Sequence, residues 1–288
     1  MASLKEIKSR IQSVKSTQKI TSAMKMVSSA KLRKAQKTIE NLFPYEQKLN
    51  GLLNNFLSAE EDNVSVYAET REVKRVAIVV FSSNSSLCGS FNTNVSKRLN
   101  ETIDTYKSLG VENILIYPVG KKVAKASRKK GFEPQNNFDL MADKPNYTAA
   151  LTLADDIMLL FKNKDIDRVE LIYHHFKSRS TQVMMEETFL PIQLKPAEKG
   201  TVALDYIVEP DRETIMSELI PKVLRLKIYT ALLDSSASEH AARTMAMQIA
   251  TDNATDLLQE LSLQYNKSRQ QAITNELLDI IGGSFGQN

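Results

Sequence analysis

One stretch near the C-terminus decides the fold: residues 222–281 read KVLRLKIYTALLDSSASEHAARTMAMQIATDNATDLLQELSLQYNKSRQQAITNELLDII. This stretch contains neither glycine nor proline, the two residues that most reliably end a helix. As a single helix it would reach roughly 90 Å, at about 1.5 Å per residue. Residues 1–43 also lack both residues. The sequence therefore predicts long helices at both chain ends, an arrangement typical of a part that transmits position or force.

Apolar residues recur every three or four positions in the N-terminal segment, which is the spacing of a coiled-coil seam. The seam runs through Leu4, Ile7, Ile11 and Val14, and later through Leu32, Ala35, Ile39 and Leu42. Between these runs the seam positions are polar: Gln18, Thr21, Lys25 and Ser28. We interpret this interruption as a segment that faces something other than its usual partner helix. The simplest pairing of the two terminal helices is antiparallel.

The middle of the chain has the pattern of an α/β domain. Strands are predicted at 73–82, 113–119, 168–176 and 182–190, and helices at 92–109, 121–130 and 147–162. Alternating strands and helices favour a largely parallel sheet, and the last two strands form a predicted hairpin. We therefore predict an N-terminal coiled-coil helix over 1–59, an α/β domain over 60–208 and a C-terminal coiled-coil helix over 209–288. Linkers are expected at 60–63 and 194–200.

Charge and composition limit the class of protein. Residues 1–40 carry ten Lys or Arg and two acids, whereas the rest of the chain has a net charge of −4. A basic N-terminal helix indicates either a solvated face or a surface for an acidic partner. No apolar run approaches the roughly 18 residues of a membrane span. With Cys88 as the only cysteine, no intrachain disulfide can form, and we expect an intracellular protein.

The loop after the first predicted strand, residues 82–92, is the place where a Rossmann-like unit binds phosphate. With Gly89 as its one glycine, the loop lacks the glycine spacing of such a site. We therefore expect its serines to cap the following helix. Cys88 is expected to be a buried structural thiol. His174 and His175 are adjacent in a strand, so they point to opposite faces and cannot share a metal. Asp165 and Asp167 are expected at ordinary solvated surface. We predict no catalytic, cofactor or metal site.

Several blocks together resemble the gamma subunit of F-type ATP synthase, over the whole chain and in order. They are residues 7–11, 17–27 and 31–36, Leu87-Cys88-Gly89 with Asn92, 237–243, 246–247, 253–254, and Tyr265-Asn266-Lys267 with Arg269, Gln270, Ile273, Thr274, Glu276 and Gly283. Asn84-Ser85-Ser86 and Thr244 depart from the family pattern, which leaves the detailed contacts of the loop open.

The resemblance implies a non-catalytic rotor shaft. The paired terminal helices would insert into the hexamer of alpha and beta subunits, and the Rossmann-like α/β domain would contact the epsilon subunit and the ring of c subunits. Rotation driven by ion flow would then cycle the catalytic sites between ADP, phosphate and ATP. The resemblance also implies contacts with beta subunits through Met24, Lys25, Arg243, Arg269, Gln270, Thr274 and Glu276. It implies a peripheral position on the cytoplasmic face of a bacterial plasma membrane.

Two other classes of protein remain as alternatives. A Rossmann-like nucleotide-binding enzyme with helical arms would bind nucleotide through Ser85, Ser86 or Gly89. A basic coiled-coil scaffold for nucleic acid would show affinity that falls steeply with salt, but it lacks aromatic residues among its basic ones, since Phe43 is the first aromatic of the chain. The coupling ion, H⁺ or Na⁺, is chosen in the membrane ring and is not encoded here.

Overall fold

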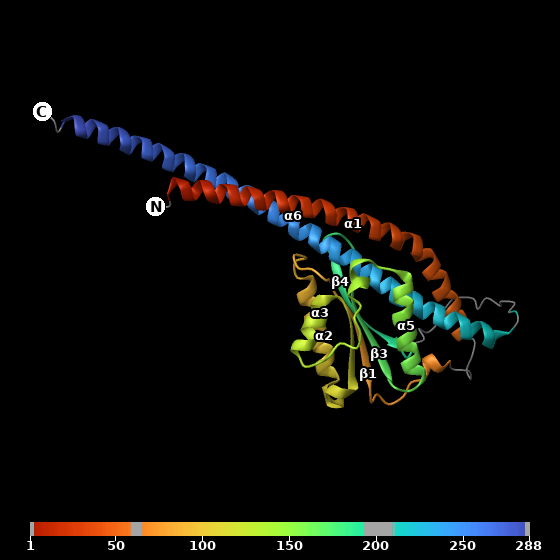
Figure 1. Ribbon diagram of the computed structural model, residues 1–288. Coiled ribbons are helices and arrows are strands. Elements are labelled where there is room, and N and C mark those ends of the chain that lie inside the picture. The colour runs from red at the N-terminus through yellow and green to blue at the C-terminus, as the bar shows by residue number, and fades with distance from the viewer. Residues whose placement is uncertain (1–2, 59–64, 193–208, 210, 286–288) are drawn as a thin grey trace. The chain divides into compact units, whose positions relative to one another are not determined.

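The computed structural model describes residues 3–58, 65–192, 209 and 211–285. Its element order is α1 (Leu4–Ser58), β1 (Val76–Phe81), α2 (Phe91–Thr105), β2 (Ile114–Val119), α3 (Lys121–Lys129), α4 (Asp139–Asp143), α5 (Tyr147–Lys162), β3 (Arg168–Phe176), β4 (Gln182–Leu190) and α6 (Arg212–Phe285). Short 3₁₀ turns lie at Val66–Ala68, Lys107–Leu109 and Val111–Asn113. Long terminal helices and an α/β middle are thus confirmed (Figure 1).

The terminal helices are longer than the segments free of glycine and proline. Helix α1 continues through Pro44 and Gly51 to Ser58, and α6 contains Pro221. A proline inside a helix removes one backbone hydrogen bond. Next to Pro221, the α6 residues Ile220, Val223 and Leu224 are buried in the core. Leu53, one turn before the end of α1, is buried in the core with residues of the sheet.

The sheet has four strands in the order β2-β1-β3-β4. Strand β1 pairs in parallel with β2 and β3, whereas β3 and β4 form an antiparallel hairpin. All six residues of β1 are buried, as expected for a central strand covered on both faces. The expected parallel sheet and the hairpin are both confirmed, and the sheet as a whole is mixed.

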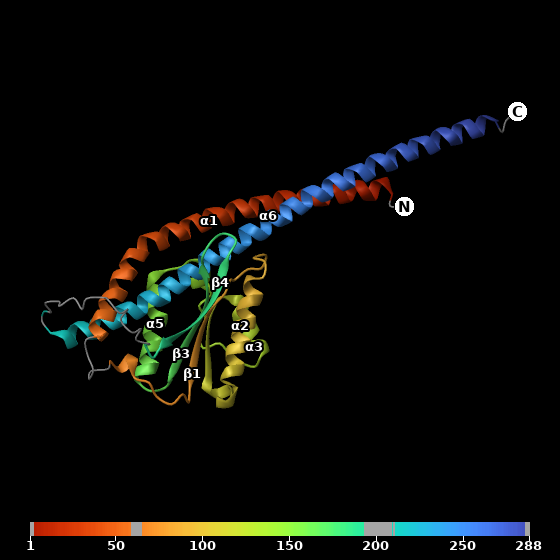
Figure 2. The ribbon, with the colours of Figure 1, turned by 180° about the vertical axis from the view of Figure 1, so that it is seen from behind.

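The two faces of the sheet have separate cores. Because side chains alternate along a strand, Val76, Ile78 and Val80 of β1 pack with α2 and α3, while Ala77, Val79 and Phe81 pack with α5 and α6. Figure 2 shows α2 and α3 on one side of the strands and α5 on the other. This is the layered arrangement of a Rossmann-like domain.

The chain divides into two compact units. One contains residues 1–28 and 244–288, and the other contains residues 29–243. Each terminal helix therefore contributes to both units. The predicted domain division at 59/60 and 208/209 stays a prediction, and the expected linkers at 60–63 and 194–200 lie outside the described residues.

Candidate functional site

The loop between β1 and α2 is held by its own side chains. Asn92 accepts a hydrogen bond from the backbone N–H of Ser83 at 3.1 Å and donates to the Cys88 sulfur at 3.1 Å and the Ser83 hydroxyl at 2.8 Å. Cys88 is buried, as predicted. The expected serine cap is wrong, because Ser90 at the start of α2 makes no capping hydrogen bond. Asn92 instead reaches back from the first turn of α2 to order the loop.

Arg243 of α6 fastens the same loop. Its guanidinium donates to the Ser85 hydroxyl at 2.8 Å and the Ser86 carbonyl at 3.4 Å, and it pairs with Glu239 at 2.6 Å. Both charged side chains are buried. Burial raises the pKa of the Glu239 carboxyl, although the neighbouring Arg243 opposes that shift. The carboxyl end of β1, where open α/β sheets bind their ligands, is therefore occupied by the chain's own guanidinium.

The two adjacent histidines point in opposite directions, as predicted. His174 is buried and stacks on Phe91 with ring centroids 4.4 Å apart, and burial lowers its pKa to about 4. His175 is half exposed and its Nδ1 lies 2.7 Å from Oδ2 of Asp234. Burial raises the pKa of Asp234 against the lowering effect of His175. Among the described residues no three His, Cys, Asp or Glu side chains are grouped to hold a metal ion.

Asp167 is not at solvated surface, which corrects the expectation for that acid. Its carboxylate accepts hydrogen bonds from the backbone N–H groups of Lys74 and Arg75, both at 2.9 Å, and pairs with Arg71 at 2.9 Å. Arg71 also donates to two backbone carbonyls at the end of α5 and just before β3. The acid is thus part of the junction that leads into β1, and its role is structural.

In the coiled-coil unit, the polar positions of α1 face α6 directly. Gln18 donates to Thr255 at 2.8 Å, Thr21 and Thr251 share a hydrogen bond of 2.8 Å, and Lys25 donates to Gln248 at 2.9 Å. We call these three pairs the polar ladder. The interpretation that α1 turns away from its partner helix here is wrong, because the seam continues with polar pairs. The predicted antiparallel pairing is confirmed by the register of the ladder.

The sequence of α6 contains polar positions that match those of α1 and could have predicted the polar ladder. Gln248, Thr251 and Thr255 recur every three or four residues, with the spacing of Gln18, Thr21 and Lys25 in α1. A polar interruption on both helices at equal spacing indicates paired polar positions in a seam. The neighbouring apolar stripe of α1 is left open to solvent: Ile20 and Val27 are 59% and 58% exposed.

The predicted contact residues fall into three groups. Met24 and Lys25 lie half buried in the coiled-coil unit, Lys25 within the polar ladder. Arg243 lies buried in the other unit, bonded to its own chain. The other four are exposed on the last third of α6: Arg269, Gln270, Thr274 and Glu276. These contacts stay predictions.

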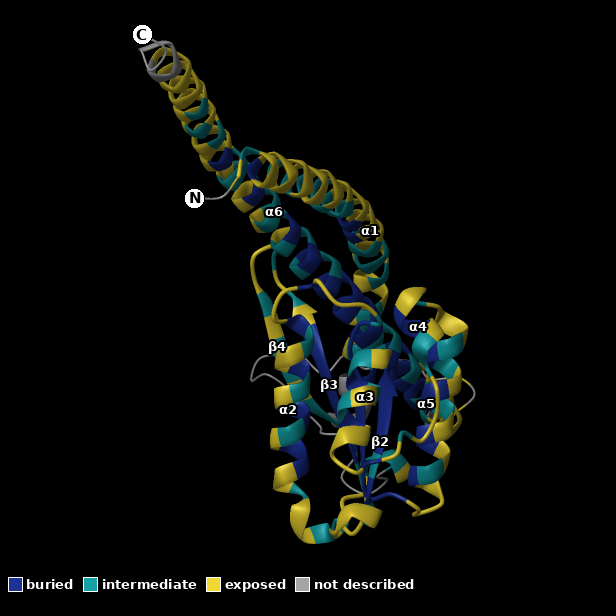
Figure 3. Ribbon diagram, turned by 60° about the vertical axis from the view of Figure 1, so that its left-hand side comes forward, coloured by how far each residue is buried: buried dark blue, intermediate teal, exposed yellow. Residues whose placement is uncertain are grey.

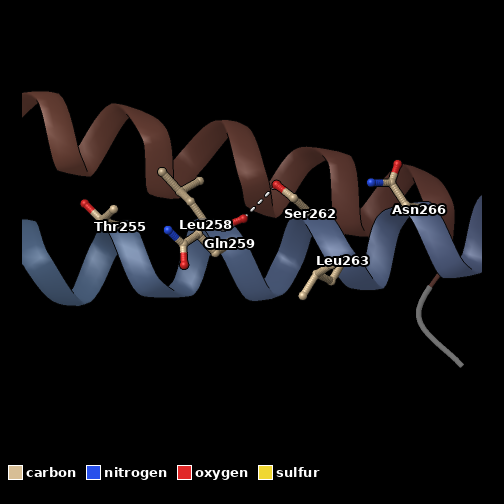
Figure 4. A pocket seen from close by; sticks show the side chains of 6 residues that line it. All are labelled: Thr255, Leu258, Gln259, Ser262, Leu263 and Asn266. Carbon is tan, nitrogen blue, oxygen red and sulfur yellow. Dashed lines mark hydrogen bonds between the residues drawn. The ribbon is translucent and has the colours of Figure 1, made fainter.

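The last third of α6 exposes apolar as well as polar side chains. In the antiparallel register of the polar ladder, Leu4 at the start of α1 lies opposite about Arg269 of α6. The residues of α6 beyond that point therefore have no described residue of α1 opposite them. Figure 3 shows this end of α6 mostly exposed. A shallow groove before it is lined by Thr255, Leu258, Gln259, Ser262, Leu263 and Asn266 (Figure 4). Large exposed apolar side chains on this part of the helix are Leu263, Ile273, Leu277, Leu278, Ile280 and Ile281.

Comparison with known proteins identifies the family. The family model described as "ATP synthase" matches residues 3–285. The chain is 62% identical to the ATP synthase gamma chain of Phocaeicola vulgatus over 99% of its own length and 100% of the relative's. The chain belongs to the ATP synthase gamma chain family. It is 54% identical to the gamma chain of Parabacteroides distasonis, over 99% of each chain. A gamma chain is the stalk component of ATP synthase and not its catalytic subunit.

Solved structures share the fold. A chain of the Euglena gracilis mitochondrial ATP synthase (OSCP/F1/c-ring) has a TM-score of 0.65 and 20% identity, covering 98% of this chain and 94% of that one. A chain of the Tetrahymena thermophila enzyme (central stalk/c-ring) has a TM-score of 0.57 and 23% identity, covering 80% and 99%. None of the described helices is both long enough and apolar enough to cross a bilayer.

Proposed function

We propose that this chain is the rotating shaft that couples transmembrane ion flow to ATP synthesis or hydrolysis in the hexamer of alpha and beta subunits. The observation that carries this proposal is the end of α6. Ile273, Leu277 and Ile280 are at least half exposed there, next to exposed Arg269 and Glu276. A contiguous apolar surface of this kind normally lies in an interface, and family membership supplies the partner.

The shaft works through differential contact. A helix pair with no internal symmetry presents a different surface to each beta subunit around it. As the shaft turns, each beta subunit meets in succession the basic face of α1, the exposed apolar side chains at the end of α6, and the exposed polar side chains beside them: Arg269, Gln270, Thr274 and Glu276. Only contacts that favour one conformation of a partner over another can shift its equilibrium, and reciprocity of coupling lets ATP hydrolysis drive the same rotation in reverse.

The proposed partner contacts divide by chemistry. Charged, amide and hydroxyl groups at the end of α6 form directional hydrogen bonds with the surrounding subunits. They belong to Arg269, Gln270, Thr274 and Glu276. Met24 supplies an apolar contact beside Lys25, and α1 carries the excess positive charge for acidic partner loops. Arg243 is already bonded to Glu239 and Ser85, so we assign it to holding the loop after β1 in the shape that a partner meets.

The remaining partners are proposed from the family. The α/β domain contacts the epsilon subunit and the ring of c subunits, and the complex holds the chain on the cytoplasmic face of a bacterial plasma membrane. The rival function, a nucleotide-binding enzyme, is disfavoured by the geometry of the loop. Asn92 and Arg243 use the polar groups of the loop at the carboxyl end of β1, where such an enzyme would bind phosphate.

Reconstitution tests the proposal. Purified alpha and beta subunits are mixed with and without the full-length chain, and ATP hydrolysis and complex size are measured. The shaft role predicts a hexamer-sized complex with one copy of this chain, and activity that depends on it. A variant with Arg269, Gln270 and Thr274 all changed to Ala should assemble less stably. Failure of the unaltered chain to associate would contradict the proposal.

A further inference from the structure

The unit formed by residues 29–243 contains a cavity of about 390 Å³ that the shaft function does not use. It lies between α1, the turn that joins α4 to α5, and α6. Helix α1 contributes Lys31 and Lys34, the turn contributes Lys144, and α6 contributes Tyr229 and His240. A cavity of roughly 300–1,000 Å³ is the size that small-molecule sites have.

Positive charge surrounds the opening. Lys31, Lys34 and Lys144 are exposed, and they come from two separate elements of the fold. Asp143 is the one acidic residue in the lining, so the lining carries a net charge of +2. Within the described parts of the chain, none of the ion pairs includes any of the three lysines. Their ammonium groups are therefore available to a ligand.

The positive charge acts on His240, which lines the cavity. His240 has its pKa lowered to about 4, first by burial and then by the positive charges of Arg243 and Lys31. Burial is the larger cause of this lowered pKa, and the cations that face the imidazole disfavour its protonation further. An anion in the cavity would offset those cations, so His240 is a built-in reporter of occupancy.

The walls suit a phosphate-bearing ligand. Lys is a common phosphate-binding residue that acts as a point charge, and the hydroxyl of Ser236 adds a hydrogen-bonding group. The Tyr229 ring, held edge-on against Tyr147 with centroids 5.3 Å apart, gives an aromatic surface. A planar base can pack on such a ring.

We propose that this cavity binds a polyphosphate anion, either free or as the phosphate chain of a nucleotide. The three lysines bind the phosphates at the mouth, and Tyr229 offers a surface for a base when one is present. The site is separate from the loop after β1 and from the exposed end of α6. It is tested on the full-length chain alone, so its failure leaves the shaft function untouched.

The experiment is calorimetric titration of the full-length chain with sodium tripolyphosphate and with ATP. In the pocket variant, Lys31, Lys34 and Lys144 are all changed to Gln. In the control variant, Lys37, Lys48 and Lys125 are changed to Gln. These lysines are exposed and lie outside the cavity lining, and their replacement removes the same charge. We expect the pocket variant to lose at least tenfold in affinity for tripolyphosphate and the control variant less than threefold. Equal losses would overturn the proposal, because they indicate unspecific attraction to a basic protein.

Nuclear magnetic resonance supplies the second measurement. The chain has three histidines, so the His240 imidazole resonance can be assigned with a His240→Gln variant. Saturating tripolyphosphate should raise the pKa of His240 in the unaltered chain and leave it unchanged in the pocket variant. An unmoved His240 in the unaltered chain would also overturn the proposal. If ATP binds more tightly than tripolyphosphate and Tyr229→Ala removes the difference, the ligand is a nucleotide. If the two affinities are equal, the site recognises the phosphate chain alone.

Discussion

Arg243 Nη2 lies 2.8 Å from the Ser85 hydroxyl, across 158 residues of sequence. This bond ties α6 to the loop after β1, and the ion pair with Glu239 on the same helix neutralises the buried guanidinium. Because both charges are buried, removing one leaves the other uncompensated. We predict that Arg243→Ala lowers the free energy of unfolding by about 3 kcal/mol, measured by urea denaturation of the full-length chain.

The paired replacement is the control for that prediction. Glu239→Gln with Arg243→Gln removes both charges and keeps polar groups of similar size, so it should destabilise clearly less than Arg243→Ala alone. A loss below about 0.5 kcal/mol for Arg243→Ala, the level of an ordinary surface substitution, would contradict the role given to this pair.

His174 makes stability depend on pH. Its pKa is about 4 in the folded chain against 6.5 ordinarily, so between these values the unfolded chain binds more protons. Stability therefore rises with pH from about 4 to 6.5 and is lost as the solution is acidified through that range. We predict that His174→Gln flattens this part of the profile by about 2–3 kcal/mol relative to the unaltered chain. Parallel profiles for the two proteins would contradict the prediction.

The polar ladder is expected to fix the register of the helix pair at a modest energetic cost. In a double-mutant cycle, Thr21→Val and Thr251→Val each leave one hydroxyl without its partner across the seam, and each should destabilise by about 1 kcal/mol. The double variant should recover most of the loss, because it leaves neither hydroxyl without its partner and places two apolar side chains against each other. Strictly additive effects, measured by thermal unfolding, would show that the two hydroxyls are not coupled.

Met24→Lys should impair coupling, because it introduces a charge where an apolar side chain is predicted to meet a beta subunit. We expect ATP-driven ion pumping in membrane vesicles to fall more than ATP hydrolysis does. Met26→Lys is the matched control on a different face of α1, where the side chain is 66% exposed, and should reduce pumping less. Unchanged pumping in Met24→Lys would count against the assigned contact.

Local chemistry made some elements predictable to the residue. The bounds of α5, β3 and β4 agree with those read from the sequence. Helix α5 starts after Asn146, whose side chain accepts the N–H of Thr148, and such a cap is a sequence signal. Helix α4 was missed because its five residues are too few to show a period.

What the sequence did not reveal depends on contacts between distant segments. Helix α1 continues past Pro44 to a segment whose Leu53 packs into the core, and tertiary packing of this kind overrides a local preference. The bond between Arg243 and Ser85 joins residues that no sequence spacing relates. The bond from Ser83 to Asn92, which takes the place of the expected serine cap, spans only nine residues, but the pattern of serines in the loop favoured a cap instead. The partner contacts predicted on α6 come from the family resemblance and stay predictions, because periodicity alone reads this segment equally well as an ordinary solvated face.

Direct observation of rotation tests the central claim most sharply. Cys88 is the only cysteine and is buried, so Cys88→Ser with Lys107→Cys gives one exposed attachment point for a visible probe. With the hexamer of alpha and beta subunits fixed to a surface, the account predicts one-directional rotation of the probe that requires ATP. Sustained ATP hydrolysis by complexes that contain this chain, while the probe stays still, would contradict it.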